Sequence, residues 1–205
     1  MDQAVVIIRQ MVSNIPDTAY GVERQMLIGD LVSRQSQEER VLIKRMFDTL
    51  LMRMFEITAS DIDLGGFGSQ GKIWYRVHGV KKPDTTLPDF TFDETNVLIH
   101  TILLERQRQF LYENRNLDFS YTVFQNDQMH RFRADAYFDL DQIALNMRAI
   151  NAVVRPYKNL EFHPNVTRIV SLAHLKEGMI LVTGITGSGK SSTLDSIIDA
   201  NNHSV

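Results

Sequence analysis

Hydrophobic positions in the first part of the chain recur at helical spacing. The first run, Val5, Ile8, Val12 and Ile15, ends where Pro16 interrupts it. Residues 36–39, Ser-Gln-Glu-Glu, have the form of a capping box. A broad apolar stripe follows, more typical of a core than of a partner-binding groove: Val41, Leu42, Met46, Phe47, Leu50, Leu51, Met54 and Phe55. We therefore expect residues 1–57 to be a helical segment that packs as a small unit.

After Ile57 the pattern changes from helical spacing to alternation, which predicts strands. A second capping box, Thr91-Phe92-Asp93-Glu94, begins a helix that runs to about Asn114. Residues 125–128 form a hairpin turn between two of the strands. The predicted strands are 61–64, 73–77, 117–124, 129–138 and about 143–154. This order describes an α+β domain over residues 58–155, with a sheet covered on one face.

A glycine-rich stretch near the carboxyl end carries the clearest chemical signal. Residues 184–191, Gly-Ile-Thr-Gly-Ser-Gly-Lys-Ser, fit the phosphate-binding loop pattern at every constrained position. The apolar run 179–183 before it is of buried-strand type, and residues 192–200 after it have a helical pattern with Leu194, Ile197 and Ile198 on one face. Chance gives this loop pattern in about one chain in a hundred of this length. The sequence therefore predicts a nucleotide phosphate site.

The loop pattern assigns a role to its polar residues. Glycines let backbone N–H groups converge on phosphate oxygens, and the following helix adds the positive end of its dipole. Lys190 would reach the β- and γ-phosphates of ATP and is the predicted catalytic residue, while the Ser191 hydroxyl would bind Mg²⁺. The other predicted nucleotide contacts in the loop are Gly184, Thr186, Gly187, Ser188, Gly189 and Ser192. We expect residues 156–177 to be a linker that includes a short helix near 166–175. A nucleotide-binding domain would then begin at residues 178–205.

Two other features are interpreted as structural. The stretch with Gly65, Gly66, Gly68 and Gly71 lacks a following helix or Gly-Lys-Ser, so it is better explained as a hairpin connection. The histidines show no paired spacing typical of metal ligands: His78, His100, His130, His163, His174 and His203. We expect them to be structural or exposed.

Composition narrows the class of protein. The 205 residues are 43% hydrophobic and 23% charged, which is ordinary for a soluble protein with one or two cores. A net charge of −3 argues against a dedicated nucleic-acid binder. The chain has no cysteine, no apolar run of membrane-spanning length and no basic start of a secretory signal. We expect a cytoplasmic protein without a transmembrane segment.

Charge is unevenly distributed along the chain. Residues 142–176 hold one acidic residue, Glu161, against five basic ones: Arg148, Arg155, Lys158, Arg168 and Lys176. This local excess suits a polyanion such as a triphosphate. A solvated face is the alternative.

Several motifs follow one another in a recognisable order. They are Ala59-Ser60-Asp61-Ile62, residues 73–79 (Ile-Trp-Tyr-Arg-Val-His-Gly), residues 117–121 (Leu-Asp-Phe-Ser-Tyr), residues 131–137 (Arg-Phe-Arg-Ala-Asp-Ala-Tyr), Arg148-Ala149-Ile150, and the loop with its flanks from Gly178 to Leu194. This order resembles the order of motifs in the motor ATPases of type II secretion and type IV pili. Within that family it resembles the pilus retraction type. The likeness covers about residues 57–200. Ile185 stands where the family usually has proline and Asp63 where a histidine is common.

The resemblance implies a PAS-like amino-terminal domain followed by a RecA-like ATPase domain, of which the chain holds the first strand, the loop and the helix. It implies a cytoplasmic homo-hexameric ring under the inner membrane. This ring would contact the inner-membrane platform proteins of the pilus or secretion system. ATP hydrolysis with Mg²⁺ would drive pilus assembly, pilus retraction or protein export. It also implies that Arg133 and Arg148 face the nucleotide, with cross-strand pairing to carboxylates such as Asp118 or Asp135 as the alternative.

The expected activity of this chain has to be compared with two alternatives. The family's acidic boxes, magnesium-supporting strand and histidine box lie beyond residue 205, so we expect this chain alone not to hydrolyse ATP. A second hypothesis is a non-catalytic interaction module in which the loop is a relic. A small-molecule P-loop kinase would need a complete core and a lid, for which we find no room.

Overall fold

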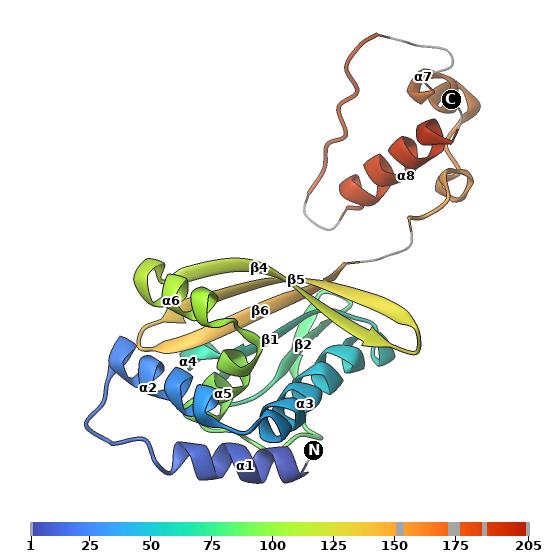
Figure 1. The fold of residues 1–205 in the computed structure, drawn as a ribbon. Helices are drawn as coiled ribbons and strands as arrows, with labels where there is room; N and C mark the ends of the chain where they lie inside the picture. Colours follow the sequence, from blue (N-terminus) through green and yellow to red (C-terminus); the bar gives the residue numbers. More distant parts are fainter. Residues whose placement is uncertain (1, 151–153, 172–176, 186–187, 204–205) are drawn as a thin grey trace. The chain divides into compact units, whose positions relative to one another are not determined.

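The computed structural model describes residues 2–150, 154–171, 177–185 and 188–203. It divides the chain into two units, Met1–Ile150 and Asn151–Val205. In the first unit an antiparallel sheet has the strand order β3-β2-β1-β6-β5-β4 (Figure 1). Its strands are β1 (Ala59–Gly65), β2 (Trp74–Val77), β3 (Val80–Pro83), β4 (Asn116–Gln125), β5 (Gln128–Asp139) and β6 (Gln142–Ile150). The predicted α+β class is confirmed.

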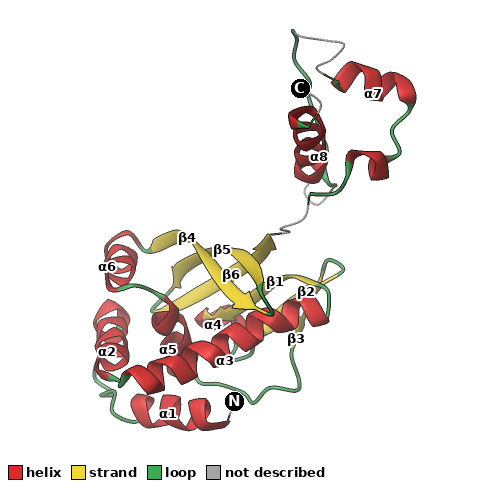
Figure 2. Cartoon of the chain, turned by 45° about the vertical axis from the view of Figure 1, so that its right-hand side comes forward, coloured by secondary structure: helices red, strands yellow, loops and turns green. Residues whose placement is uncertain are grey.

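Helices cover one face of this sheet. In both views α3 and α5 lie against the sheet, and α1 packs on these two helices on the side away from it (Figures 1 and 2). The helix α2 packs against α5 and α6, and α6 lies beside β4. The helices of this unit are α1 (Asp2–Val12), α2 (Gly21–Arg34), α3 (Gln37–Glu56), α4 (Gly66–Ser69), α5 (Phe92–Ile102) and α6 (Glu105–Asn114).

The core lies between the sheet and its helices. Along β5, Phe132, Ala134 and Ala136 are buried, while Arg133 and Asp135 between them are charged and face the opposite side. Ile8 of α1 and Phe47 of α3 belong to the same buried cluster as Phe132. The helices of residues 1–57 therefore share a core with the sheet instead of packing as a small unit of their own.

Both capping boxes predicted from the sequence are confirmed. The side chain of Ser36 accepts a hydrogen bond from the backbone N–H of Glu39, and Thr91 does the same with Glu94. The glutamate of each box accepts a hydrogen bond from the N–H of its cap residue in return. The helix that follows Thr91 ends at Ile102, however, and a second helix begins at Glu105. This break was not predicted, because no glycine or proline marks it; Leu103 turns inward there and is 5% exposed.

The glycine-rich connection after β1 is structural. It joins β1 to β2, which pair antiparallel, so the predicted hairpin is confirmed, with the single turn α4 inside it. Gly65 has φ +70°, and a Cβ at this residue would clash with the backbone oxygen of Ile143. Gly71 has φ +74°, and a Cβ there would clash with the backbone oxygen of Phe90. These glycines serve close backbone packing.

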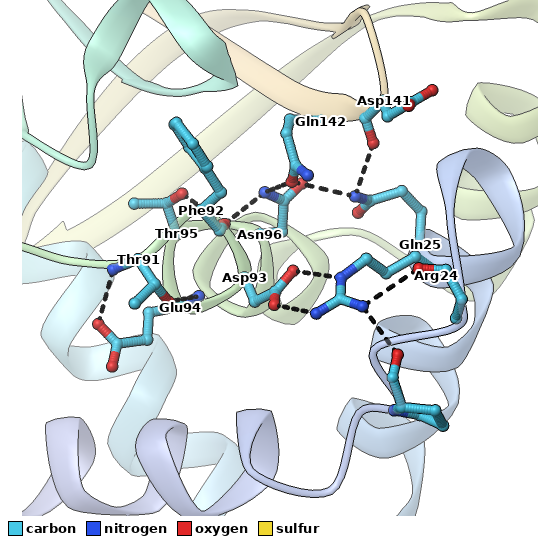
Figure 3. A network of polar contacts seen from close by, with 12 residues as sticks. Arg24, Gln25, Thr91, Phe92, Asp93, Glu94, Thr95, Asn96, Asp141 and Gln142 are labelled. Atoms are coloured by element: carbon cyan, nitrogen blue, oxygen red, sulfur yellow. Dashed lines mark hydrogen bonds and ion pairs between the residues drawn. The ribbon is translucent and has the colours of Figure 1, made fainter.

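A buried polar network joins the helices to the turn between β5 and β6. Figure 3 shows the amide side chains of Gln25, Asn96 and Gln142 pointing toward one another. Asn96 donates to the Gln142 side chain at 3.0 Å and accepts from the backbone N–H of Ile143 at 2.8 Å, and Gln25 donates to the backbone oxygen of Asp141 at 3.1 Å. Such buried amides stabilise a fold only when they are hydrogen-bonded. The network therefore fixes α2 and α5 on the end of the sheet.

The described residues of the second unit form three helical elements: a 3₁₀ helix at Tyr157–Leu160, α7 (Pro164–Val170) and α8 (Lys190–Asn202). The hydroxyl of Ser196 on α8 donates to the backbone oxygen of Arg155 at 2.7 Å. The prediction of a strand at residues 179–183 is wrong for the structure: residues 177–185 form no strand, and Leu181 is 77% exposed. A strand needs a paired neighbour, and the described residues of this unit include none.

Candidate functional site

The glycine loop leads directly into α8. Of the predicted loop residues, Gly184, Ser188 and Gly189 are described, whereas Thr186 and Gly187 lie outside the described residues. The backbone N–H of Ser188 donates to the backbone oxygen of Ile185 at 3.2 Å, which closes a tight turn. Gly184 has φ +154°, and a Cβ there would lie 2.6 Å from the hydroxyl of Ser188. A side chain at residue 184 would therefore strain this form of the loop.

The amino-terminal end of α8 is open. Gly189 is the N-cap residue in left-handed conformation, and it provides no side-chain cap. The first N–H groups of a helix have no intrahelical partner, and they carry the positive end of the helix dipole. The first turn contains no acidic residue, and the side chains of Ser191 and Ser192 are exposed. This end presents backbone donors and two hydroxyl groups to solvent, which suits a phosphate.

Lys190 is the first residue of α8. Its Nζ donates a hydrogen bond of 2.8 Å to the backbone oxygen of Ile185. The ammonium group therefore lies close to the backbone of the glycine loop at Ile185. Among the described loop residues, the Lys190 side chain bonds to Ile185, while the assignment of these residues to a nucleotide stays a prediction.

The arginines predicted to face the nucleotide lie in the first unit. Arg133 on β5 and Arg148 on β6 are directly opposite each other in the sheet, on the face opposite α3 and α5. Their side chains are 73% and 60% exposed. Arg133 lies 3.5 Å from Asp118, the carboxylate named as an alternative partner. Asp135 instead accepts from Asn116, and burial followed by the charge of Asp118 raises the pKa of Asp135.

Sequence reasoning missed the partner of Arg148. It is Asp61 on β1, whose Oδ1 accepts from the Arg148 Nε at 2.8 Å. Asp61 is directly opposite Arg148 in the sheet. Asp61 is buried in the structure, and a buried carboxylate needs a cationic or hydrogen-bonding neighbour. The strand order that provides this neighbour pairs β1 with β6, which are far apart in the sequence.

The local excess of basic residues in 142–176 is divided between the units. Arg148 belongs to the first, while Arg155, Lys158 and Arg168 belong to the second, and Lys176 lies outside the described residues. This distribution assigns no single basic surface to the stretch.

The structure describes all the histidines except His174, which lies outside the described residues. Among the described residues no group of three or more His, Cys, Asp or Glu side chains is placed to hold a metal ion. His100 is completely buried, with Nδ1 2.8 Å from the backbone oxygen of Asn96 and Nε2 3.0 Å from the hydroxyl of Tyr112. Burial lowers the pKa of His100 to about 4. In the part of the chain that the structure describes, no helix is both long and apolar enough to cross a bilayer.

Comparison with known proteins decides the family. The family described as "Type II/IV secretion system protein" matches residues 36–204, which is most of the chain. The chain belongs to this family. The match begins at the capping box of α3, so this helix is part of the family region. The resemblance over residues 57–200 did not include this helix.

Two curated relatives are similar to part of the chain. The chain is 32% identical to a twitching motility protein of Neisseria gonorrhoeae over 60% of its own length and 31% of the relative's. It is 31% identical to the type IV pilus retraction ATPase PilT of Pseudomonas aeruginosa, over 55% of its own length and 31% of that protein's. The chain thus spans about a third of the length of these relatives.

Solved structures show the same fold. The pilus retraction motor PilT with bound ADP matches 75% of this chain and 42% of its own, with 35% identity and a TM-score of 0.61. The Legionella pneumophila ATPase DotB matches 77% of this chain and 42% of its own, with 24% identity and a TM-score of 0.64, and supports the fold alone.

Proposed function

We propose that residues 184–192 bind the phosphates of ATP and that the chain is the nucleotide-binding amino-terminal part of a secretion or pilus motor ATPase. The observation that carries this proposal is the uncapped start of α8 behind a glycine turn, with the Lys190 ammonium over that turn. The similarity to a pilus retraction motor with bound ADP supports the choice of nucleotide.

The residues at the start of α8 have distinct tasks in this proposal. The Lys190 ammonium exchanges the Ile185 carbonyl for phosphate oxygens, and the backbone N–H groups at the start of α8 donate to the same phosphates. The absence of a Cβ at Gly184 lets the Ser188 hydroxyl lie close to the backbone of the loop. Ser191 is the residue that would hold Mg²⁺, which when bound neutralises phosphate charge. Ser192, the next hydroxyl on α8, is exposed and would donate to a phosphate.

The wider arrangement follows the family. We propose that Met1–Ile150 includes the PAS-like domain, that α8 and its loop begin a RecA-like domain, and that Arg133 and Arg148 face the nucleotide phosphates. Six copies would form a cytoplasmic ring that contacts inner-membrane platform proteins. ATP hydrolysis by the complete motor would then move a pilus or export a protein.

Nucleotide titration tests the proposal. We would titrate Mg·ATP into the chain by calorimetry and compare Lys190→Ala with Lys158→Ala, an exposed lysine on the 3₁₀ helix of the same unit. Loss of a charge-assisted contact to phosphate predicts affinity weakened roughly tenfold or more for Lys190→Ala and unchanged for Lys158→Ala. Equal affinities for both variants, or no binding by the unaltered chain, would favour the interaction module with a relic loop.

A further inference from the structure

The turn between β5 and β6 contains a leucine that the fold alone does not explain. Asp139 and Gln142 pair across the two strands, so Leu140 and Asp141 form a two-residue turn. Leu140 has φ +57°, a conformation that favours glycine, asparagine or aspartate in such a turn, and the residue is 75% exposed. A bulky apolar residue is therefore unfavourable at this position both in conformation and in exposure.

Two other hairpin turns of this sheet also have two residues and provide an internal comparison. His78 and Gly79 join β2 to β3, and Asn126 and Asp127 join β4 to β5. All four residues have positive φ, and glycine, asparagine, aspartate and histidine are the residues found most often in this region. The exposed leucine departs from this pattern, which indicates a role for its side chain outside the fold.

Two exposed aromatic residues belong to the segments that contact this turn. The Oδ2 of Asp139 accepts from the backbone N–H of Phe67 at 2.7 Å, so α4 lies against the turn. Asp141 lies against the start of α2, because a Cβ on Gly21 would be 3.3 Å from its Oδ1. Phe67 is 42% exposed, and Tyr20, the residue before Gly21, is 72% exposed. We define the turn surface by the exposed apolar residues and the carboxylates at this end of the sheet: Tyr20, Phe67, Asp139, Leu140 and Asp141.

The two carboxylates of the turn surface have no cationic partner. Asp139 accepts only from the backbone N–H groups of Phe67 and Gly68. Neither Asp139 nor Asp141 takes part in an ion pair formed by the residues that the structure describes. Exposed apolar side chains beside unpaired charges of one sign are complementary to a ligand that is apolar and carries the opposite sign. The turn surface therefore matches a basic, apolar ligand.

We propose that the turn surface docks a segment of a partner protein in which lysine or arginine side chains flank a large apolar one. The apolar side chain would pack on Leu140 and the two aromatic rings, since aromatic residues are enriched in the cores of protein interfaces. The basic side chains would pair with the two carboxylates. This inference does not depend on nucleotide binding, because the turn surface lies wholly within the first unit.

NMR titration of the full chain with synthetic peptides tests the proposal. The probe is the peptide Lys-Leu-Lys-Phe-Lys, and matched peptides replace its lysines by glutamate or its two apolar residues by serine. We expect the probe to shift the backbone amides of Phe67, Leu140 and Asp141, and each matched peptide to bind about tenfold more weakly or not at all. Equal binding of the glutamate peptide, or no shift of these amides by the probe, would overturn the proposal. Shifts of the same amides with rising protein concentration alone would assign the surface to a second copy of the chain, which would also overturn it.

Leu140→Gly separates docking from a role in the fold. Glycine adopts φ +57° without strain but gains freedom in the unfolded chain, so the midpoint of urea unfolding should change little. The affinity for the probe should fall about fivefold or more, because the apolar anchor is lost. Asn126→Gly is the matched control, since it makes the same kind of change in another turn of the sheet, and it should keep the affinity of the unaltered chain. Equal probe affinities for the two variants would contradict the docking role of Leu140.

Discussion

The Nζ of Lys190 donates a 2.8 Å hydrogen bond to the backbone oxygen of Ile185, across the turn of the glycine loop. This contact is exposed to solvent, and an exposed hydrogen bond contributes only about 1 kcal/mol or less to stability. We therefore expect Lys190→Ala to leave the free energy of unfolding nearly unchanged while it weakens ATP binding. Urea unfolding monitored by circular dichroism checks the first part. A large loss of stability would mean that the lysine supports the fold and not the ligand.

Gly184 provides a test of the loop geometry. Gly184→Ala would place a Cβ 2.6 Å from the Ser188 hydroxyl, in a backbone conformation that side chains rarely adopt. Strain of about 1–3 kcal/mol in the loop should then weaken ATP binding. Gly178→Ala is the matched control, since Gly178 also has a positive φ, +137°, but a Cβ there meets nothing within 4 Å. Equal ATP affinities for the two variants would show that the Ser188 contact does not shape the site.

The connection between β1 and β2 offers a similar comparison for stability. A Cβ at Gly65 would clash with the backbone oxygen of Ile143 and lie 2.8 Å from Ile99 Cδ1. We expect Gly65→Ala to destabilise the first unit by more than about 3 kcal/mol, because backbone strain and overpacking add. Gly79 has φ +81°, but a Cβ there would meet nothing within 4 Å. Gly79→Ala should therefore lower the free energy of unfolding by only about 1–2 kcal/mol. Urea denaturation measures both, and similar losses would contradict the close approach at Gly65.

The buried His100 makes stability depend on pH. Its pKa is lowered to about 4 in the folded chain by burial, against an ordinary value near 6.5 in the unfolded chain. Between these values the unfolded chain binds more protons, so stability falls as the pH is lowered from about 6.5 to about 4. The loss attributable to this residue is roughly 3 kcal/mol.

Unfolding free energies measured at several pH values would show this dependence. His100→Gln should reduce the slope between pH 6.5 and 4, even if it lowers stability at neutral pH. His78→Asn, at an exposed residue with φ +49°, is the control and should keep the slope of the unaltered chain. If both variants retained the same slope, His100 would not be the titrating group.

Local signals in the sequence predicted much of the fold. Ser36 and Thr91 begin helices as expected, because a capping box is a contact among residues three apart. The strands with a buried side were found through their alternation. The edge strand β3 (Val80–Pro83) was missed, because it is largely exposed and its residues do not alternate.

Features that depend on distant neighbours were not predictable in the same way. The apolar stripe of α3 indicates a buried face, but it does not say that the partners are α1, α5 and β1. The Asp61–Arg148 pair depends on β1 lying next to β6. In the candidate site, the loop pattern names the residues of a phosphate site, since these are adjacent in the sequence, and their contact with a nucleotide stays a prediction. The bond of Lys190 to Ile185 is a property of the folded loop that no motif states.

Backbone amide NMR of the chain during titration with Mg·ATP tests the central claim most directly, because it locates the ligand residue by residue. The account predicts that the largest shifts in the second unit occur at Gly189, Lys190 and Ser191, at the start of α8. Shifts absent from these three amides, with ATP binding elsewhere or not at all, would contradict it.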